Sequence, residues 1–307
     1  MPKTSAVRPG RKLILVLTGG LGNQLFQYSS GLALSLKNQA EFVLDNWSGF
    51  VRDTLYRRQY ELNKLHILQK KATSAEKLAF WIYHFEKKYI KPSLSFSKKI
   101  FGDFIVEQDS YFDQRICDYK IKRKTWMIGY WQSPKYFENI KATVLKTCMP
   151  LQPLQSRTLD LGWFLRKSNS IALGLRFYEE SNSPLVHANN QLTKTIQEIS
   201  FVVKKAKRLV PNAKICVFST IRVPFLSELQ LGDNIIEMNH ENGFTNTLDR
   251  LWLISNCRHH IFNNSSFYWW GAYLSENFHG GPSMGQVIFA ADNFINQDMY
   301  VNGWNKF

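Results

Sequence analysis

The chain has 307 residues, 44% of them hydrophobic and 21% charged, which suits one large or two modest α/β domains and argues against a disordered protein. No apolar run approaches the roughly 18 to 20 residues that span a bilayer. The formal net charge of +15 at pH 7 fits a solvated basic surface, a nucleotide diphosphate, an anionic membrane or a nucleic acid, and charge alone does not choose among them.

Short β-rich runs alternate with helical patterns along the first half of the chain. The run Leu13–Leu17 follows basic residues, as in a signal peptide, but it continues into a glycine turn with no cleavage-like segment. We therefore expect a core strand there and a cytoplasmic protein. The pattern predicts helices at 24–37 and 74–92 and strands at 13–17, 42–44 and 125–130.

Two prolines in the segment 149–153 interrupt regular structure, and the α/β pattern starts again after them. It predicts helices at 190–209 and 246–256 and strands at 171–175, 215–218, 235–238, 260–262 and 287–289. We predict an α/β protein of two Rossmann-like halves, an N-terminal domain at 1–155 and a C-terminal domain at 156–307. A nucleotide would lie in a central cleft between them, at the carboxyl ends of the strands.

The first segment with candidate chemistry is Thr18–Tyr28, where a strand ends in glycines and a helix begins at once. Glycine lets the backbone approach a ligand, and a helix N-terminus offers N–H groups to an anion. A tight strand-to-helix turn needs glycines in any case, and no third glycine completes a dinucleotide fingerprint. The candidate binding residues in this segment are Gly20, Gly22, Asn23 and Gln24.

The second segment, Ile171–Glu180, ends a predicted strand with Arg176 and then two carboxylates, Glu179 and Glu180. Arginine suits bidentate phosphate binding and can neutralise a departing diphosphate. An ordinary salt-bridged strand end is the alternative, and without further context it is the preferred one.

The third segment, Arg258–Tyr273, ends a predicted strand with small polar residues and continues into an aromatic helix. A capped core helix explains the aromatic residues, and we expect Phe267, Trp270 and Leu274 to face the core. It explains less well a polar run that can donate several hydrogen bonds to a diphosphate. That run is Asn263, Asn264, Ser265 and Ser266.

No metal centre is expected. The four cysteines lie far apart without a CxxC pair, and the seven histidines show no HxxxH spacing. The adjacent His259 and His260 would point to opposite faces of a strand and could not share a ligand.

Together the three segments resemble the α-1,2-fucosyltransferases of glycosyltransferase family 11. Gly19–Tyr28 matches the family's GGLGNQxFQY segment, and Asn264–Ala272 matches NSSFSWWGA, with Tyr268 in place of a serine. Gly129–Ser133 resembles the family's GYWQS segment, and Phe218-Ser219 stands where the family has an FSD-like strand end. The matching segments follow in the expected order from residue 14 to residue 275.

One segment departs from the family pattern. Where the family has an HxRRGDY-like motif, only the first arginine survives, as Arg176, and Gly174 replaces the histidine. Phe177, Tyr178 and Glu179 stand in place of Arg-Gly-Asp. If a missing residue were indispensable the chain would be inactive. We prefer a divergent active subgroup, because the glycine loop and the asparagine–serine segment are intact.

The resemblance implies a GT-B fold, with GDP-fucose held mainly by the C-terminal half and transferred with inversion, without a metal or cofactor. The lack of any DxD motif agrees with this. Arg176 would face the β-phosphate, and the base for the acceptor hydroxyl would be Glu179, Glu180 or Asp45. The other residues expected at the donor are Phe218, Ser219, Asn264, Ser265 and Ser266, with the glycine loop opposite.

The expected partners are GDP-fucose and a galactose-containing oligosaccharide or lipid-linked glycan. Peripheral contact with anionic lipid at the inner membrane face would suit the basic charge. A non-catalytic GDP-sugar- or glycan-binding descendant is the nearest alternative, motivated by the eroded arginine motif. A nucleic-acid-binding protein is the alternative from another class, but we find no zinc knuckle, RNP-like strand or basic recognition helix and expect no nucleic acid.

Overall fold

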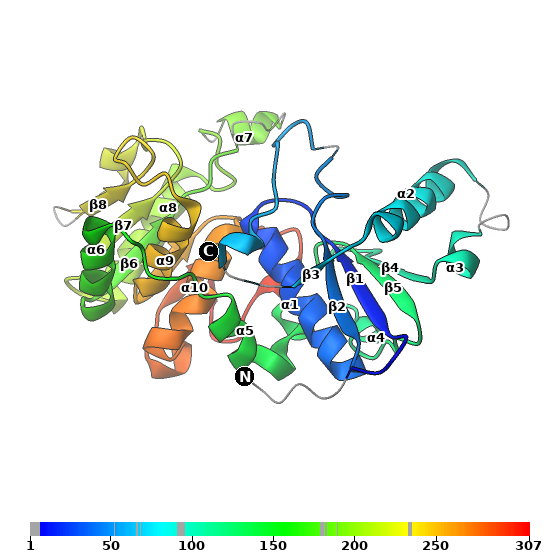
Figure 1. The fold of residues 1–307 in the computed structure, drawn as a ribbon. Coiled ribbons are helices and arrows are strands. Elements are labelled where there is room, and N and C mark those ends of the chain that lie inside the picture. Colours follow the sequence, from blue (N-terminus) through cyan, green and yellow to red (C-terminus); the bar gives the residue numbers. More distant parts are fainter. Residues whose placement is uncertain are drawn as a thin grey trace. The chain divides into compact units, whose positions relative to one another are not determined.

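A computed structural model describes residues 7–51, 53–65, 67, 69–90, 96–178, 181, 183–188, 190–232 and 235–307. The chain divides into two compact units, Met1–Val144 and Leu145–Phe307, and Figure 1 shows the elements of each. The division falls before the predicted boundary at 155/156. Each unit is built on one sheet, and every pairing between described strands is parallel.

The N-terminal unit contains a five-stranded sheet in the order β3-β2-β1-β5-β4. Its strands are β1 (Lys12–Val16), β2 (Glu41–Asp45), β3 (Lys70–Lys71), β4 (Asp103–Val106) and β5 (Lys124–Ile128). Its helices are α1 (Leu21–Asn38), α2 (Ser74–Tyr89), α3 (Ser97–Ile100) and α4 (Gln114–Cys117), and α5 (Lys141–Thr147) runs across the division. Short 3₁₀ turns lie at Leu62–Leu65, Pro134–Tyr136 and Glu138–Ile140.

The C-terminal unit contains a six-stranded sheet in the order β11-β10-β9-β6-β7-β8. Its strands are β6 (Ser170–Gly174), β7 (Lys214–Phe218), β8 (Ile235–Met238), β9 (His259–Phe262), β10 (Ile288–Ala290) and β11 (Asn305–Lys306). Its helices are α6 (Ser156–Lys167), α7 (Pro184–Ala188), α8 (Ile196–Leu209), α9 (Thr247–Asn256) and α10 (Ser266–His279). Numbered within the unit, this order is 3-2-1-4-5-6, that of a Rossmann sheet. Short 3₁₀ turns lie at Leu226–Leu229, Pro282–Met284 and Gln297–Met299.

Local sequence accounts for most of these elements. The central strands are continuous apolar runs because helices cover both faces of a parallel sheet. Helices α2 and α8 each begin with a capping box, formed by Thr73 with Glu76 and by Thr195 with Glu198. These boxes fix the starts of the two helices and leave their apolar stripes facing the sheets.

Most of the predicted strands and helices are confirmed within a few residues of their bounds. The predicted helix 190–209 is too long, because its capping residue is Thr195. In α10, Trp270 and Leu274 are buried as expected, whereas Phe267 is only half-buried in the first turn. Among the described residues, no helix is both long and apolar enough to cross a bilayer.

Candidate functional site

In the N-terminal unit, two segments of the sequence analysis meet where the strand order reverses. Strands β1 and β5 are neighbours although the chain visits three other strands between them. The glycine loop follows β1 and the segment Gly129–Ser133 follows β5, so both leave the same edge of the sheet. Asn23 Oδ1 accepts a hydrogen bond of 2.8 Å from Gln132 Nε2 and joins them. In open parallel sheets such a switch point is the usual ligand-binding crevice.

The glycine loop is fixed by a buried amide. Gln24 Nε2 donates to the carbonyls of Gly19 (2.9 Å) and Gln59 (2.8 Å), and its Oε1 accepts from the N–H of Glu61 (2.9 Å). Gly20 is the N-cap of α1 and offers no side chain to its N–H groups. A Cβ on Gly20 would lie 3.7 Å from the guanidinium of Arg58, so a cation lies beside this helix start. The sequence analysis missed Arg58, because only the folded loop brings it there.

The loop after β5 is held by a second residue that the sequence did not predict. Glu107 follows β4, and its carboxylate accepts the N–H groups of Tyr130 (2.6 Å) and Trp131 (3.0 Å). Trp131 is buried with φ of 55°, a left-handed conformation that a bulky residue rarely adopts. Burial raises the pKa of Glu107, although both hydrogen bonds act in the opposite direction. The carboxyl group of Glu107 at this edge of the sheet therefore has a raised pKa.

Asp45, a candidate base, ends β2 and is fully buried. Its Oδ1 accepts the N–H groups of Trp47 (3.1 Å) and Ser48 (2.9 Å), which caps the turn that follows. Its Oδ2 is buried without a hydrogen-bond partner among the described residues. The contacts of Oδ1 are those of a residue that shapes a loop.

The C-terminal unit has its own switch point, between β6 and β9. There Asn263 Oδ1 accepts from the backbone N–H of Arg176 (2.8 Å), and Asn263 Nδ2 donates to the carbonyl of Arg176 (2.8 Å). Asn263 is buried, whereas Arg176 is only half-buried and lies 5.1 Å from the ring centroid of Tyr178. The Asn263 amide thus holds the backbone of residue 176 through both of its polar groups.

Gly174 and Tyr268 pack against each other beside this clamp. A Cβ on Gly174 would lie 2.5 Å from Cγ of the Tyr268 ring, closer than real atoms approach. The buried Tyr268 hydroxyl lies 2.8 Å from the carbonyl of Phe218 and 3.3 Å from that of Leu175. Gly174 and Tyr268 are both departures from the family pattern, so the two substitutions are sterically linked.

Hydrogen bonds also hold the asparagine–serine run in place. Ser265 is the N-cap of α10, and its hydroxyl accepts the N–H of Tyr268 at 3.4 Å. Ser266 begins the helix, where N–H groups of the first turn have no intrahelical acceptor. Asn264 Nδ2 donates to the carbonyl of Asn293 (3.2 Å), and the Asn264 carbonyl accepts from the hydroxyl of Tyr178.

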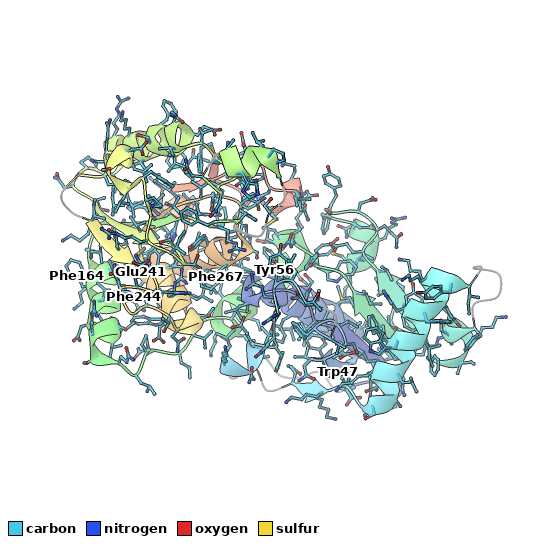
Figure 2. All side chains as sticks on the ribbon, turned by 90° about the horizontal axis from the view of Figure 1, so that it is seen from above. Trp47, Tyr56, Phe164, Glu241, Phe244 and Phe267 are labelled. Atoms are coloured by element: carbon cyan, nitrogen blue, oxygen red, sulfur yellow. The ribbon has the colours of Figure 1, made fainter. Side chains whose placement is uncertain are left out.

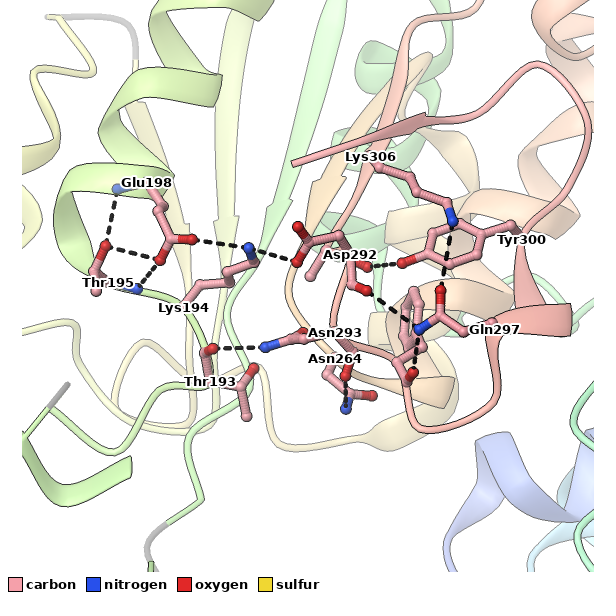
Figure 3. Close-up of polar contacts among 12 residues, drawn as sticks. Thr193, Lys194, Thr195, Glu198, Asn264, Asp292, Asn293, Gln297, Tyr300 and Lys306 are labelled. Carbon is pink, nitrogen blue, oxygen red and sulfur yellow. Dashed lines mark hydrogen bonds and ion pairs between the residues drawn. The ribbon is translucent and has the colours of Figure 1, made fainter. Parts of the chain in front are cut away.

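Asn264 belongs to a polar network shown in Figure 3. Asn293 Nδ2 continues it to the carbonyl of Thr193 at 2.7 Å. Nearby, the buried Lys194 forms ion pairs with Asp292 (2.7 Å) and Glu198 (2.9 Å), so its charge is already neutralised. The network therefore fixes the loop after β9, and two carboxylates already balance the charge of Lys194.

Phe218 and Ser219 end β7 and are buried. Phe218 acts through its carbonyl, and the Ser219 carbonyl accepts from Arg250 Nη2 at 2.8 Å. Arg250, on α9, is buried, and its Nε has no hydrogen-bond partner among the described residues. Its Nη1 lies 3.1 Å from Nε2 of His240, and burial, followed by the charge of Arg250, lowers the pKa of His240. No pattern in the sequence predicted this buried cation.

The predicted residues therefore fall into two sets. Arg176, Phe218, Ser219, Asn264, Ser265 and Ser266 come together at one edge of the C-terminal sheet, and Gly20, Gly22, Asn23 and Gln24 at one edge of the N-terminal sheet. Glu179 and Glu180 lie outside the described residues. Within the described ranges, no group of three or more His, Cys, Asp or Glu side chains is placed to hold a metal ion.

Comparison with known proteins bears on the class of the protein and on its fold. The chain is 27% identical over 263 residues to an α-1,2-colitosyltransferase of Escherichia coli, covering 84% of this chain and 86% of that protein. It is also 27% identical over 278 residues to the O-antigen biosynthesis glycosyltransferase WbnK of Escherichia coli, covering 84% and 89%. No family model matches the chain. The two relatives support a glycosyltransferase.

Among solved structures, the α-1,6-fucosyltransferase NodZ, co-crystallised with GDP, matches with a TM-score of 0.51. The match covers 86% of this chain and 92% of NodZ at 14% identity, so it bears on the fold alone. The fold is GT-B. The predicted fold class is thus confirmed, and the two switch points described above belong to the two α/β halves of the GT-B architecture.

Proposed function

We propose that the protein transfers L-fucose from GDP-β-L-fucose to the 2-hydroxyl of a terminal galactose on an oligosaccharide or lipid-linked glycan. The reaction would proceed with inversion and without a metal. The observation that carries the proposal is the Arg176–Asn263 clamp at the switch point of the C-terminal sheet. The clamp joins the backbone of Arg176 to Asn263, which lies shortly before the start of α10. An arginine and a helix N-terminus both favour a diphosphate. The similarity to two glycosyltransferases and to the GDP-bound fold of NodZ supports the same donor class.

The proposed mechanism needs a positive field at the leaving group. In an oxocarbenium-like transition state, negative charge develops on the departing GDP, and fixed donors aimed at that charge lower the barrier. Arg176 would supply a cation, and Ser265, Ser266 and the first turn of α10 would supply hydrogen bonds. Arg250 would add to the positive potential from its buried position behind Ser219.

The first test measures GDP release from GDP-fucose in EDTA, with and without a panel of β-galactosides. We expect release that depends on the acceptor and survives EDTA. Tight binding of GDP-fucose with no release on any acceptor would favour the non-catalytic descendant. Absence of binding would overturn the proposal.

Replacing Arg176 tests the central assignment. We expect Arg176→Ala to lower kcat by about 100-fold or more, in line with the loss of one donor that stabilises transition-state charge. The fold should be kept, because Asn263 holds only the backbone of residue 176. Arg208→Ala, at an exposed position on α8, is the matched control. Near-wild-type turnover of Arg176→Ala would remove Arg176 from the mechanism.

The predicted candidates for the base that accepts the proton of the acceptor hydroxyl are Glu179, Glu180 and Asp45. We add Glu107 as a fourth candidate. Burial raises the pKa of Glu107, which favours the uptake of a proton. If Glu107 is the base, Glu107→Gln should lower kcat and abolish the acidic limb of the pH–rate profile, whereas Asp45→Asn should mainly lower the melting temperature. An unchanged acidic limb in Glu107→Gln would exclude Glu107.

Colitosyl transfer is a second candidate, favoured by the similarity to an α-1,2-colitosyltransferase. The clamp would contact the diphosphate and not the sugar, so it does not distinguish fucose from colitose. Turnover with GDP-fucose and with the corresponding colitose donor, compared as kcat/KM on one acceptor, decides between them. A preference of tenfold or more for the colitose donor would replace fucose in the proposal.

A further inference from the structure

Helix α2 carries a second apolar stripe that faces away from the core. Leu78, Ile82, Phe85 and Tyr89 follow one another at spacings of four, three and four residues, which places them on one side of the helix. Leu78, Phe85 and Tyr89 are 58%, 56% and 63% exposed. The rings of Phe85 and Tyr89 lie 4.8 Å apart, so they form one aromatic surface.

The fold does not need this stripe, because the other side of α2 already packs. Ala79 and Phe80 are buried in the core of the N-terminal unit. Tyr83 stacks on Phe104 of β4 with ring centroids 4.0 Å apart. An amphipathic surface helix usually carries polar residues opposite its core stripe. Large apolar side chains at these positions therefore point to a binding partner.

The exposed charged side chains of α2 and α3 are all positive. Of the residues of α2 and α3, all of which the structure describes, only Glu76 and Glu86 are acidic. Both are buried; Glu76 forms an ion pair with Lys12 at 2.9 Å, and Glu86 accepts hydrogen bonds from Ser97. The lysines of the two helices lie towards solvent, and α3 adds the exposed Ile100. These lysines are Lys77, Lys87, Lys88, Lys98 and Lys99.

Trp47, labelled in Figure 2, adds a further exposed aromatic ring beside the N-terminal part of α2. It is 50% exposed, and its ring makes an edge contact with Trp81 at 6.5 Å between centroids. Lys77 Nζ lies 5.8 Å from the centroid of Trp47. Tryptophan and tyrosine beside lysine are the residues that favour the boundary between lipid headgroups and acyl chains.

We propose that this lysine–aromatic face, formed by α2, α3 and Trp47, binds an anionic lipid surface. The apolar stripe would enter the headgroup boundary, and the lysines would be attracted to the anionic lipid. A second copy of the chain fits less well. A two-fold interface pairs the same patch with itself, which would set lysine against lysine. The inference concerns binding alone and does not depend on the proposed transfer reaction.

The test uses sedimentation of the full chain with vesicles of phosphatidylcholine alone or with added phosphatidylglycerol. One variant removes the stripe (Leu78→Ser, Phe85→Ser, Tyr89→Ser) and another reverses charge (Lys87→Glu, Lys88→Glu, Lys98→Glu, Lys99→Glu). The exposed lysines and Phe201 of α8 provide a matched control, Phe201→Ser with Lys204→Glu and Lys205→Glu. Melting curves establish that each variant is folded.

We expect the wild type to bind anionic vesicles at least tenfold more tightly than neutral ones, and both α2–α3 variants to lose at least tenfold in affinity. The α8 variant should stay within twofold of the wild type. Failure of the wild type to bind anionic vesicles would overturn the proposal, as would unchanged binding by the folded α2–α3 variants. A loss confined to the α8 variant would place the lipid surface elsewhere. If the stripe variant instead abolished self-association of the wild type without affecting vesicle binding, a second copy would be the occupant.

Discussion

Gly174 and Tyr268 stand at the positions where the family pattern has a histidine and a serine, and they are in contact. A Cβ at 174 would lie 2.5 Å from the tyrosine ring, so a histidine at this position would force the ring or the backbone to move. Compared with the sequences that the chain resembles, this site has a smaller residue at 174 and a larger one at 268 on α10. Arg176 keeps its backbone clamp beside this pair. Such a compensated change supports a divergent site over a decayed one.

A double-mutant cycle tests the linkage. Gly174→His alone should destabilise the protein by about 1–3 kcal/mol through overpacking. Tyr268→Ser alone should cost about 3–5 kcal/mol, because it leaves a cavity and removes the hydroxyl from two buried carbonyls. The double variant should be more stable than the sum of the single effects by at least 1 kcal/mol in urea unfolding. Additive costs would show that the two positions are independent.

The sequence predicted the positions of site residues that lie close to a strand end along the chain. Arg176 and Ser265 follow apolar strands directly, so their position at a strand end could be predicted from local pattern alone. Arg250 and Glu107 could not, because Arg250 reaches the end of β7 from α9, and Glu107 lies under the loop after β5 only once β4 pairs with it. Non-local pairing is invisible to a periodicity argument.

Strands β9 and β10 are joined by a histidine whose protonation state the structure specifies. The Nδ1 of His259 accepts the N–H of Val287 at 2.9 Å, so this nitrogen carries no proton. Its Nε2, 3.0 Å from Asn169 Oδ1, must then be the donor. Burial, helped by the charge of Arg258, lowers the pKa of His259 to about 4. Burial also lowers the pKa of the neighbouring His260 to about 3.

These two histidines predict acid sensitivity. Above pH 6.5 they are neutral in both the folded and the unfolded chain and do not affect the stability. Between pH 6.5 and about 4 the unfolded chain binds protons that the folded chain does not, so each histidine should reduce the free energy of unfolding by about 1.4 kcal/mol per pH unit. His260→Leu should lessen this slope in urea unfolding at pH 7, 6 and 5. The exposed His187→Gln is the control, and equal slopes in all three proteins would contradict the prediction.

At the element scale, apolar runs predicted the central strands and the edge strand β8, whereas the edge strands β3, β4 and β11 were not predicted. Strands β3 and β11 have two residues each, and they exist only through pairing with β2 and β10. Helix α6 was missed for a related reason. Its Gly162 lies against Trp252 of α9, so its buried face is set by a partner distant in sequence.

At the scale of the whole molecule, the sequence predicted two α/β halves but not the order of their strands. Alternating strands and helices fit several topologies. The pairings of β1 with β5 and of β6 with β9 select the one in which the motif segments meet. Each half thereby acquires a switch point, with glycines and Arg58 at one and Arg176 with Arg250 at the other. The buried cation and the N-terminus of α10 both favour an anion, which supports the proposal that the C-terminal half holds the diphosphate.

Hydrogen exchange of the full chain with GDP tests this division of roles. If the C-terminal half holds the nucleotide, GDP should slow amide exchange in peptides covering 174–178, 219–222 and 263–269. These segments contain the clamp, the strand end that Arg250 contacts and the first turn of α10. The glycine loop at 18–24, which belongs to the N-terminal half, should change much less. Arg176→Ala, with its backbone clamp intact, should weaken GDP binding and require more nucleotide for the same protection. Protection confined to 18–24 would assign the nucleotide to the N-terminal half and reverse the roles proposed for the two sheets.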